Sequence, residues 1–216
     1  MLKDFVLEGS ETIGQEEIFH YTSVESLFKI VESKSLRLCS TKFMNDWKVM
    51  LMIRDVTNET LLKSKGIPYN PERINEIKRL TEGANFESFI ISFSKREDSL
   101  NQWGFYGDNT KGLSIGFDVD RLKSRLELLL LVTSIEAKNH FKLSMKSVIY
   151  DLEKQCEELS VNEYRKEKKK TIRLSETDFG LSFYANSLKS GYFSDEKEVR
   201  IVYNPNITVT GSQINI

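Results

Sequence analysis

Two groups of polar side chains, far apart in the sequence, are of the types that chemistry needs. His20 and Thr22 lie two positions apart in an apolar, strand-like run, so they share one face of a strand. Glu196 and Glu198 lie two positions apart at the start of a second such run. A neutral imidazole beside a hydroxyl can hold hydroxyl groups or phosphates, and a fixed carboxylate stabilises a developing cation. We therefore expect the two groups to form two walls of one cleft, held by rigid strands.

Each group also has a purely structural interpretation, and the local sequence leaves both open. His20 fits a half-buried histidine whose ring bonds to a backbone carbonyl. Arg200 follows the two glutamates on the same strand face, so Glu198 and Arg200 could neutralise each other on an exposed edge strand. In the functional interpretation one glutamate stabilises the cation and the other orients the nucleophile.

Two further pairs of residues could take part in binding. Asn45 and Asp46 are favoured helix N-caps, and capping the following helix is their leading interpretation. Trp103 and Tyr106 are three positions apart, so they could share a helix face and pack into the core. Alternatively, one of these two rings stacks on a flat ligand ring.

Several classes of site are disfavoured by the spacing of residues. The two histidines, His20 and His140, have no second ligand at the spacing of a helical zinc site, so we expect no metal. Gly107, Gly112 and Gly116 match neither a dinucleotide-binding GxGxxG nor a phosphate-binding loop. A Rossmann fold and a nucleoside-triphosphatase are therefore rejected.

The composition favours a cytoplasmic protein. Basic and acidic residues number 31 and 32, so the net charge of −1 gives no argument for binding nucleic acid or a membrane through overall charge. Cys39 and Cys156 form no CxxC and are interpreted as free thiols of a reducing compartment, with a single disulfide between them as the alternative. The start of the chain lacks the apolar core of a signal peptide, and the longest aliphatic run, 128–132, is too short to span a bilayer.

The alternation of apolar runs and polar breaks predicts one α+β domain over 1–216. Ser23 is expected to cap a helix that follows the first strand. Mainly helical segments are expected at about 47–82 and about 151–190, with a further helix at 119–130. Strands are expected at 18–22, 36–39, 89–94, 112–118, 147–150 and 198–203.

Taken in order, these landmarks resemble an uncharacterised bacterial family over about residues 18–203. Members of that family share seven short motifs in a fixed order. In this chain the motifs are His20-Tyr21-Thr22, Leu36-Arg37-Leu38, Asn45-Asp46, Ser92-Phe93-Ser94, Trp103 with Tyr106, Lys111-Gly112 with Gly116-Phe117, and Phe193 with Glu196, Glu198 and Arg200.

That family in turn is similar to the ADP-ribosyltransferase superfamily, through its His-x-Thr opening strand and its terminal Glu-x-Glu. The resemblance implies a split mixed or antiparallel sheet with flanking helices, and NAD as a substrate. It implies that His20 and Thr22 hold the NAD ribose and diphosphate, and that Tyr106 stacks on nicotinamide. The other residues expected to bind the cofactor are Tyr21, Asn45, Asp46, Trp103 and Arg200. Glu198 would bind the ribose 2′-hydroxyl and steady the cation, while Glu196 would orient the acceptor.

The sequence therefore predicts an NAD-dependent ADP-ribosyltransferase-like enzyme that acts on a protein or nucleic-acid acceptor. A toxin or phage-defence effector is the role that this resemblance suggests, and an antitoxin partner and the oligomeric state stay open. The alternative is a catalytically inactive nucleotide- or partner-binding module on the same fold. Two departures favour it, because Val49 stands where the family usually has an acid and Thr110 where it often has a histidine.

Overall fold

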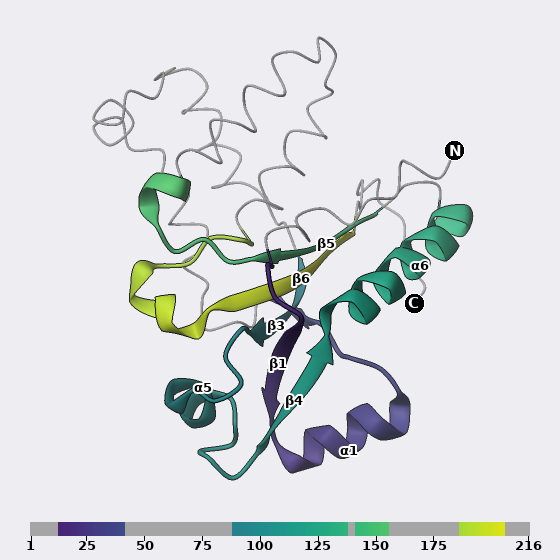
Figure 1. The fold of residues 1–216 in the computed structure, drawn as a ribbon. Coiled ribbons are helices and arrows are strands. Elements are labelled where there is room, and N and C mark those ends of the chain that lie inside the picture. The colour runs from purple at the N-terminus through teal and green to yellow at the C-terminus, as the bar shows by residue number, and fades with distance from the viewer. Residues whose placement is uncertain (1–12, 42–87, 138–140, 156–185, 206–216) are drawn as a thin grey trace.

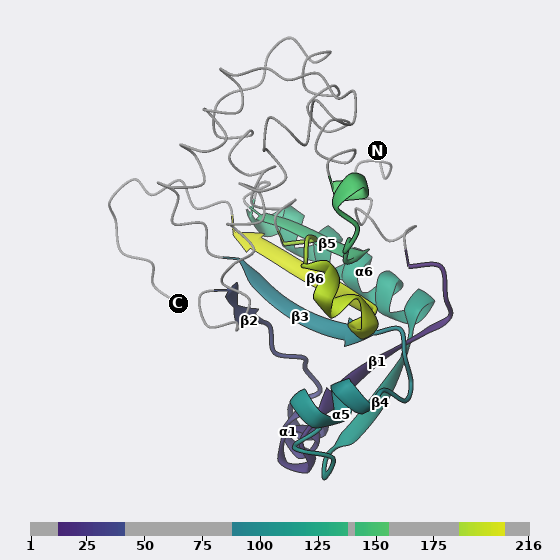
Figure 2. The same cartoon turned by 90° about the vertical axis from the view of Figure 1, so that its left-hand side faces the viewer.

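The computed structural model describes residues 13–41, 88–137, 141–155 and 186–205, which hold a six-stranded sheet and a few helices (Figures 1 and 2). The expected helical segment at 47–82 and most of that at 151–190 lie outside these residues, as do Asn45, Asp46 and Val49. In the described part of the chain, no helix is both long and apolar enough to cross a membrane.

The strands form one open antiparallel sheet in the order β4-β1-β3-β6-β5, with β2 paired to β3. This confirms a mixed helix-and-sheet protein built on an antiparallel sheet. The strands are β1 (Glu17–Thr22), β2 (Cys39–Ser40), β3 (Phe89–Ser94), β4 (Leu113–Asp118), β5 (Phe141–Ser147) and β6 (Glu198–Pro205).

The sheet is weakest between β1 and β3. These strands pair at Phe19 and Ser94 alone, whereas β1 and β4 pair over six positions and β3 and β6 pair over six. One step further along, the His20 ring, instead of the backbone, reaches the carbonyl of Ser92. Figure 1 shows the β1–β4 pair running in a different direction from β3, β6 and β5.

One face of the sheet carries the hydrophobic core. Alternate residues of the strands point to it, among them Ile91 and Phe93 on β3 and Val199 and Ile201 on β6. Helix α6 (Val119–Ala137) covers this face and packs partly buried leucines against the core. The intervening polar residues of β3 and β6 consequently face the other side of the sheet.

The elements on that other side are short. Helix α1 (Val24–Ser33) starts at Ser23, whose hydroxyl accepts the Ser26 N–H at 3.1 Å, so the expected cap is confirmed. Helix α5 (Leu100–Phe105) and the 3₁₀ helix η3 (Gly191–Glu196) contact each other.

Two predicted strands are wrong. The strand expected at 147–150 lies instead at Phe141–Ser147, where Leu143 and Met145 alternate with polar residues, and Ile149 makes only an isolated bridge to Leu188. The strand expected at 36–39 is reduced to Cys39–Ser40, because Leu36 and Leu38 pack against the core from an irregular segment. An apolar run alone does not separate a strand from a buried loop.

The junction of β4 with β1 requires a glycine at position 112. An added Cβ there would lie 2.2 Å from the Thr22 carbonyl oxygen and 2.9 Å from the Gly107 carbonyl. We predict that Gly112→Ala destabilises the fold by about 1–3 kcal/mol, through overpacking beside Thr22. Gly104→Ala is the matched control, since nothing lies within 4 Å of its Cβ position and alanine favours a helix. Urea unfolding measures both, and equal midpoints for the two variants would contradict the prediction.

Candidate functional site

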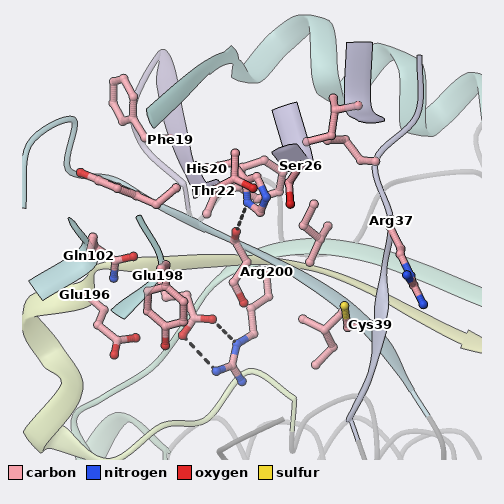
Figure 3. Close-up of a pocket in the computed structure, with 18 of the residues that line it drawn as sticks. Phe19, His20, Thr22, Ser26, Arg37, Cys39, Gln102, Glu196, Glu198 and Arg200 are labelled. Carbon is pink, nitrogen blue, oxygen red and sulfur yellow. Dashed lines mark hydrogen bonds and ion pairs between the residues drawn. The ribbon is translucent and has the colours of Figure 1, made fainter. Parts of the chain in front are cut away.

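A cavity of about 1010 Å³ lies where β1 and β3 separate. Its walls come from β1, α1 and the following segment, β3, α5, and the η3–β6 region. Figure 3 shows two groups of side chains at this cavity, His20 with Thr22 and Glu196 with Glu198 and Arg200. The two polar groups that the sequence pointed to thus line one cavity.

A buried ion pair on β6 forms the firmest part of this wall. Arg200, which is 1% exposed, donates from Nε to Glu198 Oε1 at 2.8 Å and from Nη2 to Glu198 Oε2 at 2.9 Å. Its remaining terminal nitrogen donates to the Asn186 carbonyl at 3.1 Å. Burial works to raise the pKa of the Glu198 carboxyl, but the charge and hydrogen bonds of Arg200, together with Lys189, lower it to about 2. Glu198 is therefore an ionised carboxylate with both oxygens occupied.

The interpretation of this pair as an exposed edge is wrong. Strand β6 lies between β3 and β5, and Glu198 is 5% exposed. Charges are rarely buried so completely unless they are paired, which is why the two side chains form a bidentate contact.

A second cation, Lys189, joins the two glutamates. Its Nζ lies 2.6 Å from Glu196 Oε2 and 3.2 Å from Glu198 Oε2, and the lysine is 5% exposed. Glu196 does not continue the strand, because it ends η3, and Lys197 with a φ of 45° turns the chain into β6. The expected shared strand face is thus wrong, yet both carboxylates still meet one ammonium group. Burial raises the pKa of Glu196, and Lys189 opposes that rise.

His20 presents a neutral ring to the cavity. Its Nδ1 lies 3.0 Å from the Ser92 carbonyl oxygen, which can only accept, so Nδ1 carries the proton and Nε2 is an acceptor. Burial lowers the pKa of His20, and the bond to Ser92 only partly offsets this. The bond to a backbone carbonyl was expected, and because it uses Nδ1 it leaves Nε2 as the ring atom that can accept a hydrogen bond from a ligand.

The aromatic residues of the sequence motifs separate into two roles. Tyr106 lines the cavity and is 46% exposed. Trp103 does not line it; its Nε1 donates to Asp98 at 2.7 Å, and its ring packs edge-on against Tyr21 with centroids 4.9 Å apart. The Tyr21 hydroxyl donates to the backbone carbonyls of Arg96 and Glu97. Trp103 and Tyr21 therefore fix α5 against β1.

Two residues bonded to the glutamates, Lys189 and Tyr150, were not expected from the sequence. The Tyr150 hydroxyl accepts the Glu198 N–H at 2.8 Å, and burial followed by the charge of Glu198 raises the pKa of this phenol. Both residues occupy irregular segments, so no periodicity marked them. In the described residues, no group of three or more histidine, cysteine or acidic side chains is placed to hold a metal ion.

The buried ion pair makes the fold sensitive to acid. Because the pKa of Glu198 falls from 4.5 to about 2 on folding, its contribution is complete above pH 4.5 and is lost as the pH falls toward 2. We expect about 3 kcal/mol of stability to disappear over that window, and Glu198→Gln to lack this part of the slope. At neutral pH the same variant should cost about 3–5 kcal/mol, since it leaves Arg200 without its partner.

Urea unfolding at a series of pH values between 2 and 7 measures this difference. Glu127→Gln, on the exposed surface of α6, is the control and should keep the wild-type slope. A wild-type slope in Glu198→Gln would show that this pair does not govern acid stability.

Comparison with known proteins gives one family match. Residues 102–201 match the model of a family described as a protein of unknown function (DUF2971). The matched stretch includes Tyr106, Lys189, both glutamates and Arg200, whereas His20 lies before it. No curated protein matches the chain, and no solved structure does. A domain of unknown function thus covers the acidic wall of the cavity, and nothing in the comparisons links the chain to the ADP-ribosyltransferases.

Proposed function

We propose that this protein binds NAD in the cavity and transfers ADP-ribose from it to a protein or nucleic-acid acceptor. The observation that carries the proposal is that His20 and the two glutamates line the same cavity. Its volume of about 1010 Å³ is at the upper end of the usual range for small-molecule sites, as a dinucleotide requires.

The reaction needs a fixed negative charge beside the ribose. When the bond between ribose C1′ and the nicotinamide nitrogen breaks, its electron pair leaves with nicotinamide and the ribose becomes a cation. An acceptor oxygen or nitrogen then bonds to C1′ and loses its proton to solvent or a base. Glu196 and Glu198 are held without freedom to reorganise, which is the property that makes a carboxylate effective in stabilising a transition state.

The opposite wall supplies binding groups for the dinucleotide. Nε2 of His20 accepts a hydrogen bond from a ribose hydroxyl, and the nearby Thr22 hydroxyl serves the ribose or diphosphate. Tyr106 offers a ring to nicotinamide at the acidic end. The separation of β1 from β3 beyond Phe19 and Ser94 is what makes both walls reachable by one ligand.

One observation favours the second candidate, a binding module without catalysis. Both Glu198 oxygens are occupied by Arg200, and Lys189 adds a second positive charge. A carboxylate so compensated stabilises a further cation poorly. In that case the cavity would hold a nucleotide and leave its glycosidic bond intact.

Calorimetric titration with NAD and chromatographic detection of nicotinamide separate the two candidates. We predict saturable binding with nicotinamide release by the wild type, and a loss of release of about 100-fold in Glu196→Gln. Replacing His20 with Phe keeps a ring but removes both Nε2 and the Nδ1 bond to Ser92, and should weaken NAD binding about tenfold.

Glu127→Gln is again the control and should behave as the wild type in both assays. Binding without release would replace the enzyme by the binding module, and no binding of NAD would refute the enzyme and exclude NAD as the ligand of the binding module. Glu196→Gln is a cleaner test than Glu198→Gln, because Glu198 is the partner of Arg200 and its loss endangers the fold.

A further inference from the structure

Lys189 compensates the negative charge of the two neighbouring buried glutamates, Glu196 and Glu198. Two carboxylates that are 6% and 5% exposed repel each other, and burial alone would protonate one of them. Lys189 contacts both carboxylates, at 2.6 Å and 3.2 Å, while the described ion pair of Arg200 is with Glu198. The four side chains together carry no net charge, and Lys189 is the member that joins Glu196 to the rest.

The lysine is held in place from several directions. Its backbone N–H donates to the Ile149 carbonyl at 3.1 Å, and its carbonyl accepts from Gln155 Nε2 at 3.0 Å. Its ammonium group also lies 4.9 Å from the centre of the Phe193 ring, within the range of a cation–π contact. A side chain anchored in this way orients the carboxylates that it binds.

The two glutamates differ in what remains available to a ligand. Glu198 has both oxygens in the bidentate contact with Arg200. Only Oε2 of Glu196 is bonded, to Lys189, and no hydrogen bond from the described residues reaches its Oε1. Glu196, which lines the cavity, thus keeps one oxygen without a described hydrogen bond and is in ion-pair contact with a single cation.

We propose that Lys189 is a positioning residue that holds Glu196 ionised with Oε1 presented to the substrate, while Glu198 and Arg200 support the cluster from behind. This inference rests on the proposed function, and it exchanges the roles that the resemblance implied for the two acids. Burial raises the pKa of Glu196 and Lys189 opposes it, so removing the lysine favours the protonated acid. The groups that face Glu196 are Lys189, Glu198, Arg200, Tyr106 and Tyr150.

The test follows the titration of Glu196 directly. In protein carrying ¹³C-labelled glutamate, the Glu196 carboxyl signal is identified by its absence from Glu196→Gln and recorded against pH. We expect Lys189→Met to move this titration to higher pH and Lys189→Arg to leave it near that of the wild type. Lys197→Met removes an exposed lysine of the same segment and should change nothing.

Nicotinamide release is measured on the same variants. We expect Lys189→Met to reduce it about 100-fold at neutral pH, with the acidic limb of its pH profile moved upward. If Lys189→Met is too unstable to study, the double variant Lys189→Met with Glu196→Gln should recover stability, because the unpaired acid is gone.

An unchanged Glu196 titration in Lys189→Met overturns the proposal, as does a double variant no more stable than the single one. A wild type that releases no nicotinamide, with a Glu196 titration that still depends on Lys189, refutes the proposed function and leaves the positioning role standing. Nicotinamide release by the wild type, with a Glu196 titration that Lys189→Met leaves unchanged, supports the proposed function and refutes the positioning role of Lys189.

Discussion

The cavity wall depends on burying four charges at one place in the sheet. Desolvating each charged group costs several kcal/mol, and this cost is offset only when every charge is paired with good geometry. Arg200 meets that condition through hydrogen bonds that include, within the described residues, two to Glu198 and one to the Asn186 carbonyl. Lys189 then joins Glu196 to the same cluster. Because the two cations balance the two carboxylates, removing any one member leaves the cluster with one uncompensated charge, and the positions of η3, β6 and the segment before them are tied together.

The opening between β1 and β3 forms the other wall of the cavity, opposite the buried charges. Antiparallel strands normally continue pairing until one of them ends, and here pairing stops after Phe19 and Ser94. The Ser92 carbonyl then receives its hydrogen bond from the His20 ring, so the opening leaves this carbonyl satisfied. The same contact fixes the tautomer of the ring and directs the acceptor nitrogen away from the sheet. One hydrogen bond thus stabilises the gap in the sheet and prepares a ligand-binding group.

Strand positions could be predicted wherever apolar runs were long and bounded, as at β3, which lies where the sequence indicated. The position predicted for β5 was wrong because the β-branched pair Val148-Ile149 indicates a strand more strongly than the weaker apolar–polar alternation of residues 141–147, where the strand lies. The pairing of Glu198 with Arg200 followed from strand spacing, but their burial did not, since the order of strands in a sheet is not written in local patterns. Lys189 could not be foreseen at all. Its contacts arise from an irregular segment, where one lysine among many has no distinguishing period.

The difference between an enzyme and a binding module rests on how negative charge is shared within this cluster. At about 4 Å two unit charges interact by about 4 kcal/mol near a protein surface, so each cation in contact with a carboxylate cancels much of its effect on a third charge. Glu198 has two such cations and Glu196 has one. The more strongly ionised acid is therefore the weaker stabiliser of a new cation, and the acid with the raised pKa is the stronger, provided that it stays ionised. Lys189 keeps Glu196 ionised, and because it contacts only Oε2 it leaves Oε1 of Glu196 able to act on a new cation.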